Sequence, residues 1–428
     1  ALDAIRDMSA HEEFGRNQMI QVERRKRVAL MRHAMNTVPF WNETCRSMRM
    51  DPGDAADPEN FSRLPVMEKG LIRGRLQDLV SRDLAGNRLD PNSTSGSTGQ
   101  PLRFYTDIRS KAFRKASTVR LRGWLGIRQG DSVAHLWGSS IDQARAQAWR
   151  GRLHSWITRE LFLSAYKLSD DDMAGYASLI RGRRVSLIVG YPSVMEEFGR
   201  FCARKRLEFP HLKAIICSAE TLYEDQKTAV QEFLGVPVYN RYGSREVGDM
   251  AQERPGSNGL VVNSDRVFLE IVREDGTPCE SGETGDVIVT DLDNYGMPFI
   301  RYRIGDRAAW SAEVAGGFPV LLGVDGRSLD VDRTADGRRI GGTFWTIVLR
   351  EKPGMEKFQV VQRSVEGIEN RYVRSDREPD RDWIRARIRE HCGPGLDVRF
   401  ESVDAIPPGA GGKHRVVISE CSGGSGGA

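Results

Sequence analysis

The sequence contains no run of about 18 apolar residues, the length that a helix needs to span a membrane. Residues 1–18 carry charges where the apolar core of a signal peptide would lie. We therefore expect a cytoplasmic protein with no membrane partner. The composition, 39% hydrophobic and 29% charged, is typical of a globular protein and excludes a disordered chain. At about 150 residues per domain, the length of 428 residues predicts more than one domain.

The sequence also lacks the patterns of a zinc protein and of a nucleic-acid-binding protein. Its six cysteines include no Cys-x-x-Cys pair, and its seven histidines form no cluster with metal-ligand spacing. We expect reduced cysteines and no structural zinc. The net charge is only +4, and the basic run at residues 24–27 lies among apolar residues spaced as in an amphipathic helix. A solvated helix face is therefore favoured over a nucleic-acid partner.

The middle of the chain alternates between strand and helix patterns. Residues 185–190 and 213–218 are continuous apolar runs, as expected for buried parallel strands, and residues 236–240 predict a third strand. Helical stretches follow the first two strands, which favours a parallel sheet with helices packed on it. Two residue pairs with capping-box spacing predict the starts of those helices: Ser193 with Glu196, and Thr221 with Glu224.

The rest of the chain differs from this middle part. Residues 11–38 predict a helix that ends before Pro39, strands separated by turns follow Gly248, and a charged α+β region follows Gly326. We expect an α/β fold with two domains. The large N-terminal domain, residues 1–327, has parallel α/β layers and a β-rich subdomain, and residues 328–428 form a small mobile α+β domain with a flexible tail.

A loop of hydroxyl residues and glycines at residues 93–101, STSGSTGQP, is the strongest chemical signal. Its backbone N–H groups and hydroxyls can surround a polyphosphate. It is not a Walker A loop, because GxxxxGK[ST] is absent. Taken alone, the loop is more often an ordinary linker.

Two further segments place polar residues at the ends of strands. Residues 240–246, NRYGSRE, follow a predicted parallel strand, where ligands bind in such sheets. The tyrosine can stack on a base, and the glutamate suits a magnesium ion. Residues 297–306, MPFIRYRIGD, end in an aspartate that can accept hydrogen bonds from two ribose hydroxyls. An ordinary turn and a hairpin end remain the alternatives for each segment by itself.

Together and in this order, the three segments resemble the adenylate-forming enzymes, in particular the phenylacetate–CoA ligase-like branch with its capsule-biosynthesis relatives. The resemblance covers essentially the whole chain. Further matching pieces are residues 64–73, Tyr191-Pro192-Ser193, Ser218-Ala219-Glu220, Gly326-Arg327 with Asp330, and Gly411-Gly412-Lys413-His414-Arg415.

The resemblance implies roles for individual residues. Glu246 would hold Mg²⁺, Lys413 would act at the carboxylate and α-phosphate, and Thr98 in the loop would join them as a catalytic residue. Asp330 would lie at the hinge of the mobile domain, although only one acidic residue follows Gly326-Arg327 where the family commonly has two. The expected ATP-binding residues are Thr94, Ser95, Gly96, Ser97, Thr98, Gly99, Ser218, Ala219, Glu220, Asn240, Tyr242, Gly243, Asp306 and Arg327.

The resemblance also implies a reaction. A carboxylic acid, aryl or small acyl, would be activated by ATP and Mg²⁺ to an acyl-adenylate with release of pyrophosphate. The acyl group would then pass to CoA or to the phosphopantetheine of a carrier protein. Whether the protein forms a homodimer is left open. Transfer to an amine or a hydroxyl, and an inactive nucleotide-binding relative, are the alternatives. Trp137 and Tyr191 are candidates for the acid pocket, and Arg245, where the family often has threonine, is expected to face solvent.

Overall fold

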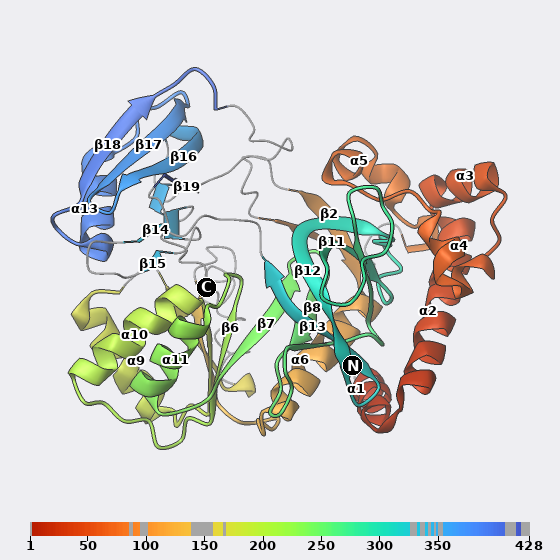
Figure 1. The fold of residues 1–428 in the computed structure, drawn as a ribbon, viewed down its shortest axis with the longest axis horizontal. Helices are drawn as coiled ribbons and strands as arrows, with labels where there is room; N and C mark the ends of the chain where they lie inside the picture. The colour runs from red at the N-terminus through yellow and green to blue at the C-terminus, as the bar shows by residue number, and fades with distance from the viewer. Residues whose placement is uncertain are drawn as a thin grey trace. The chain divides into compact units, whose positions relative to one another are not determined.

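The structure is a computed structural model that describes residues 2–84, 89–94, 102–137, 157–165, 168–325, 332–333, 339–340, 344–345, 348–349, 354–406 and 417–420. The chain divides into two compact units (Figure 1). The first unit comprises residues 1–95, 102–129 and 239–327, and the second comprises residues 96–101, 130–238 and 328–428. None of the helices in the described part combines the length and the apolar character that crossing a bilayer demands.

The helices of the first unit come mainly from its N-terminal part. Pro39 stands at the first position of the helix that follows α2, so that α2 ends two residues before it, as predicted. The helix predicted from residue 11 begins at Arg16, after a short 3-10 turn. The helices are α1 (Leu2–Ala10), α2 (Arg16–Thr37), α3 (Pro39–Met48), α4 (Pro58–Ser62), α5 (Lys69–Gly74) and α6 (Ile108–Trp124).

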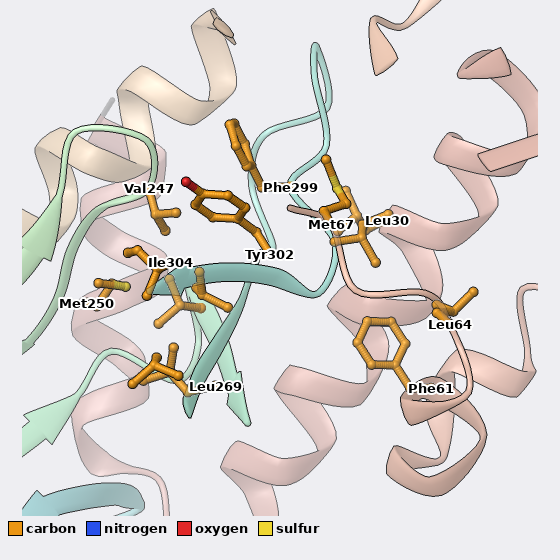
Figure 2. Close-up of a cluster of buried hydrophobic side chains, with 14 of the residues drawn as sticks. Leu30, Phe61, Leu64, Met67, Val247, Met250, Leu269, Phe299, Tyr302 and Ile304 are labelled. Atoms are coloured by element: carbon orange, nitrogen blue, oxygen red, sulfur yellow. The ribbon is translucent and has the colours of Figure 1, made fainter. Parts of the chain in front are cut away.

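Antiparallel strands make up the rest of the first unit. They lie in the order β10-β11-β12-β13-β9-β8-β7, and β1 pairs separately with β2. Their bounds are β1 (Leu89–Ser93), β2 (Arg103–Asp107), β7 (Val238–Ser244), β8 (Gly248–Gln252), β9 (Leu260–Val262), β10 (Val267–Val272), β11 (Thr284–Asp291), β12 (Tyr302–Ala315) and β13 (Phe318–Asp325). Figure 2 shows the core that these strands share with α2 and the segment after α4, around Leu30, Phe61, Met67, Leu269 and Tyr302.

A parallel sheet with helices forms the first described part of the second unit. Strands β3 (Val133–Trp137), β4 (Glu160–Ser164), β5 (Leu187–Gly190) and β6 (Ala214–Ser218) are parallel, in the order β6-β5-β3-β4. Every residue of β5 and β6 is buried, as the apolar runs predicted. The helices are α9 (Asp170–Gly182), α10 (Pro192–Arg204) and α11 (Glu224–Leu234). The predicted α/β fold class is confirmed.

The C-terminal part of the second unit has its own mixed sheet and core. The sheet has the order β18-β17-β16-β19, and α13 packs with it around Phe358, Tyr372 and Ile388. The elements are β14 (Asp332–Arg333), β15 (Arg339–Ile340), β16 (Met355–Ser364), β17 (Gly367–Arg374), α13 (Arg381–Cys392), β18 (Asp397–Ser402) and β19 (Val417–Ser419). The boundary between residues 327 and 328 stays a prediction as a boundary between two domains.

Both predicted capping boxes are wrong. Helix α10 begins at Pro192 and α11 begins at Glu224, and neither has a side-chain cap. The Ser193 hydroxyl instead donates to Glu220, which lies after the neighbouring strand β6. A distant partner therefore outcompetes the local one, and a proline at the first helical position takes the place of the cap.

Candidate active site

The turn between β7 and β8 carries Glu246, and it has a tightly defined backbone. A Cβ atom at Gly243 would lie 2.8 Å from the carbonyl oxygen of Gly248, so only glycine allows this close approach of the two strands. Gly248 has a φ of +89°, a region that favours glycine. The Val247 N–H donates to Ser244 Oγ at 3.1 Å and closes the turn. The motif NRYGSRE thus folds into one fixed conformation.

The Glu246 side chain is buried and oriented by a single hydroxyl. The Tyr302 hydroxyl donates to Glu246 Oε1 at 3.0 Å, and Tyr302 itself is fully buried. Figure 2 shows the Tyr302 ring among the core side chains, with its hydroxyl pointing toward the segment that carries Val247. Among the described residues, no lysine, arginine or histidine forms an ion pair with the Glu246 carboxylate, although Arg114 acts on it electrostatically from a longer distance. A buried carboxylate without an ion-pair partner suits a bound cation.

A second contact in the first unit joins the other two motif residues. The Tyr242 hydroxyl, on β7, donates to Asp306 Oδ2, on β12, at 3.0 Å. Gly305, with a φ of +97°, precedes Asp306 in the strand. The Asn240 N–H donates to Glu253 at 2.8 Å, which fixes the start of the same segment. The structure therefore brings together an aromatic ring and a carboxylate that are far apart in sequence.

Strand β1 connects this turn to the Ser/Thr/Gly loop. Arg245 is half-buried and donates from Nε to Asn92 Oδ1 at 3.2 Å, so the prediction that it faces solvent is wrong. Thr94 and Leu102 exchange two hydrogen bonds: the Thr94 N–H donates to the Leu102 carbonyl at 3.0 Å, and the Leu102 N–H donates to Thr94 Oγ1 at 3.1 Å. Thr94 therefore holds together the two positions that flank residues 95–101.

The candidate residues of the second unit lie at the carboxyl ends of its parallel strands. Trp137 ends β3 and Tyr191 follows β5, and their rings stack with centroids 4.4 Å apart. Ser218 ends β6, and Ala219 after it adopts a φ of +71°. This edge is where open α/β sheets bind ligands, and the roles of these residues stay predictions.

Glu220 continues this edge and is held in place. Its Oε2 accepts hydrogen bonds from the Ser193 N–H at 3.2 Å and from the Ser193 hydroxyl at 2.8 Å. Ser193 lies in the first turn of α10, where the unbonded N–H groups and the helix dipole favour a carboxylate. The Ser218-Ala219-Glu220 segment and the Tyr191-Pro192-Ser193 segment are therefore joined, as two strand ends of one sheet.

Several predicted residues lie outside the described part of the chain: Ser95, Gly96, Ser97, Thr98, Gly99, Arg327, Asp330 and Lys413. Conversely, four residues around the Glu246 turn were missed: Arg114, Arg266, Asp291 and Tyr302. Only Tyr302 lies within one of the motifs, and its hydrogen-bonding role could not be deduced from its position. The other three come from segments without any motif.

The chain is similar in sequence to several known proteins. The family model of the CapK C-terminal domain matches residues 333–420. Protein CapK of Staphylococcus aureus is 22% identical over 421 residues, which cover 94% of this chain and 90% of that protein. The phenylacetate–coenzyme A ligase of Aromatoleum evansii is 25% identical over 325 residues, which cover 73% of this chain and 70% of that protein.

A solved structure shows the same fold. The 2-hydroxyisobutyryl-CoA ligase in complex with 2-HIB-AMP and CoA has a TM-score of 0.68 and 18% identity, and the match covers 96% of this chain and 92% of that chain. The match with this ligase shows that the chain has its fold. Distant sequence homology over most of its length places the chain in the adenylate-forming superfamily, in the phenylacetate–CoA ligase and CapK branch.

Proposed function

We propose that this protein activates a carboxylic acid with ATP. A carboxylate oxygen forms a bond to the α-phosphorus, the bond from that phosphorus to the bridging oxygen breaks, and pyrophosphate leaves. A thiol, of CoA or of a carrier protein's phosphopantetheine, then attacks the acyl carbon of the acyl-adenylate and AMP leaves. Since little covalent chemistry falls to the protein, positioning and charge stabilisation carry the catalysis.

The hydrogen bond between Tyr242 and Asp306 is the observation that carries this proposal. It holds an aromatic face beside a carboxylate, which is the pair of groups that a nucleoside requires: a ring to stack on the base and an acceptor for the ribose hydroxyls. Both residues are half-buried and thus accessible to a ligand. The Ser/Thr/Gly loop that follows β1 would supply N–H and hydroxyl donors to the phosphates.

The geometry at Glu246 fits the proposed Mg²⁺. Glu246 is only 4% exposed, one of its carboxylate oxygens accepts from Tyr302, and no basic side chain in the described residues forms an ion pair with it. A hard cation prefers such an oxygen ligand, and when bound it offsets the charge of the phosphate oxygens. Glu246 would thus hold the ion at the nucleotide phosphates.

Residues 328–428 would act as a mobile domain with Asp330 at its hinge. Lys413 lies in a glycine-rich segment, GAGGKHR, that is long enough to carry a cation to the reacting groups. There it would stabilise the charge that develops between the carboxylate and the α-phosphate. The stacked Trp137 and Tyr191 rings would form an aromatic wall for the acid, which favours an aryl substrate.

Transfer of the acyl group to an amine or a hydroxyl is the alternative for the second step. Both acceptor classes share the first step, so that acyl-adenylate formation is common to them.

ATP–pyrophosphate exchange across a panel of aryl and aliphatic acids tests the proposal. Exchange that requires both one of the acids and Mg²⁺ is the expected result. No exchange with any acid, in protein that binds ATP, would instead indicate an inactive nucleotide-binding relative. For the best acid, release of AMP in the presence of CoA, an amine or an alcohol then decides the acceptor.

A further inference from the structure

Two arginines, the fully buried Arg266 and the partly buried Arg114, bind the backbone of the turn that carries Glu246. Arg114 Nη1 donates to the carbonyl of Arg245 at 3.0 Å, and Arg114 Nη2 donates to the carbonyl of Glu246. Arg266 Nη2 donates to the carbonyl of Val247. Three consecutive carbonyls of the turn are therefore held by two guanidinium groups from distant parts of the first unit, on α6 and directly before β10.

One aspartate links the two arginines. Asp291, at the end of β11, lies 3.2 Å from Arg266 Nη1 and 3.6 Å from Arg114 Nη2, and it is fully buried. Asp291 thus faces both positive charges, and the carboxylates of Asp249 and Glu246 also act electrostatically on Arg114. The carbonyl oxygens of the turn also accept hydrogen bonds from both guanidinium groups. These bonds stabilise the positive charges and fix the backbone of the turn.

The backbone of the turn leaves room for Arg114 at Gly248. At Gly248, a Cβ atom would lie 3.3 Å from Arg114 Cγ, so the chain there has no side chain and lets Arg114 come close. The arginines bind the backbone of the turn, and the Tyr302 hydroxyl binds the carboxylate of Glu246. Both the backbone and the side chain of Glu246 are thereby fixed by other side chains of the first unit.

We infer that Arg114, Asp291, Arg266 and Tyr302 are positioning residues for Glu246, and we call these four residues the Glu246 mount. The inference rests on the proposed function, since it assumes that Glu246 holds a divalent cation with ATP. Groups that orient a metal ligand typically raise the metal affinity by about 10- to 100-fold. The mount would therefore be visible as cation affinity and not only as protein stability.

The structure offers a matched pair of variants on one helix. Arg114 and Arg120 both lie on α6, both are largely buried, and both are paired with a buried aspartate. Only Arg114 contacts the turn, whereas Arg120 binds Asp265 and Asn263. Lysine at either position keeps the charge but cannot span two acceptors as a guanidinium group does. Arg114→Lys is therefore the test, and Arg120→Lys is the control.

Binding of Mn²⁺ together with ATP, measured by electron paramagnetic resonance without any acid and so without turnover, is the readout. We expect Glu246→Gln to abolish the tight Mn²⁺ site and Arg114→Lys to weaken it about tenfold. Arg120→Lys should lower the melting temperature but leave the affinity within about twofold of wild type, because distant sites act independently.

Unchanged Mn²⁺ affinity in folded Arg114→Lys, beside a clear loss in Glu246→Gln, would overturn the mount and leave the proposed function intact. Equal Mn²⁺ binding by wild type and Glu246→Gln would overturn the metal role of Glu246 itself. If Arg114→Lys does not fold, Tyr302→Phe decides, since it keeps the ring packing and removes only the hydroxyl. Its affinity should fall several-fold, on the order of the effect of other groups that orient metal ligands, and no change would refute the mount.

Discussion

The two units bury different kinds of side chain. Every charged residue that is buried in the described part of the chain belongs to the first unit: Glu23, Arg27, Asp107, Arg120, Glu246, Asp265, Arg266, Asp291, Asp293 and Arg301. The buried polar residues described in the second unit are all uncharged: Ser132, Ser186, Ser218, Gln226, Gln359, Gln362 and Asn370. The first unit thus combines an apolar core with paired buried charges, whereas the described part of the second unit buries apolar and uncharged polar side chains only.

The difference shows two ways of placing a functional residue. In the second unit, Tyr191 and Ser218 gain their positions from strands whose apolar side chains fit any α/β layer. In the first unit, Glu246 gains its position from directional contacts with particular charged partners. Apolar packing tolerates exchange of similar residues, whereas a buried ion pair leaves an unpaired charge when one partner is changed.

The strongest way to test this contrast is to remove one buried charge from the first unit. Asp265 accepts hydrogen bonds from Arg120 at 2.6 Å and 2.9 Å and contacts His11 at 2.8 Å. Asp265→Asn leaves the buried Arg120 with only the partly exposed Glu12, 3.5 Å away, as a counter-charge, so the free energy of unfolding should fall by about 3 kcal/mol. Urea denaturation followed by circular dichroism at pH 7 measures the change.

The matched control lies in the second unit. Asp170 pairs with Arg204 at 2.9 Å, but both side chains are about half exposed. Asp170→Asn should therefore change the free energy of unfolding by less than about 1 kcal/mol. Similar losses in the two variants would contradict the proposed difference between the units.

The pH dependence of the same pair sharpens the comparison. Burial alone would raise the pKa of Asp265, but Arg120, His11 and Lys26 outweigh it and hold the pKa well below the ordinary value of 3.8. A depressed pKa stabilises the fold at every pH above the unfolded value, and this stabilisation is lost as the pH falls toward the folded value. The deficit of Asp265→Asn should be constant between about pH 5 and pH 7 and should narrow below about pH 4. A deficit that grows on acidification would refute this assignment.

A change of Lys413 extends the comparison from stability to chemistry. Lys413→Ala should slow acyl-adenylate formation about a hundredfold or more, equivalent to about 3 kcal/mol, since it removes a charge that acts mainly in the transition state. Acyl transfer from a supplied acyl-adenylate should stay within about threefold of wild type. Both half-reactions are measured in one preparation, with its folding checked by circular dichroism. Adenylation close to the wild-type rate would rule out the catalytic role.

The smallest effect is expected at Ser193. Ser193→Ala removes the hydroxyl that donates to Glu220, but the Ser193 N–H still donates to the same oxygen. The free energy of unfolding should fall by about 1 kcal/mol, the usual net value of one such hydrogen bond, and the affinity for ATP should fall only slightly. A loss as large as that of Asp265→Asn would show that the second unit also depends on charged contacts.

The same contrast explains which features could be predicted from the sequence. Strands β5 and β6 could be located within one or two residues, because a buried parallel strand needs only a continuous apolar run. The motif residues could be found because they lie in short contiguous segments. The Glu246 mount could not be found from the sequence, since Arg114 and Glu246 are 132 residues apart and no local pattern relates them. Ser193 was misassigned for the same reason, because its partner Glu220 lies 27 residues away.

The first unit is interrupted in sequence by residues 130–238, so its motifs and their supporting residues lie on both sides of this insertion. Arg114 reaches the carbonyls of Arg245 and Glu246 from before that interruption. A fragment that starts at residue 239 would contain NRYGSRE and RYRIGD in full, yet it would lack Arg114. A chimaera that exchanges this region between relatives therefore has to exchange α6 as well. The residues that position Glu246 are contiguous in space but not in sequence.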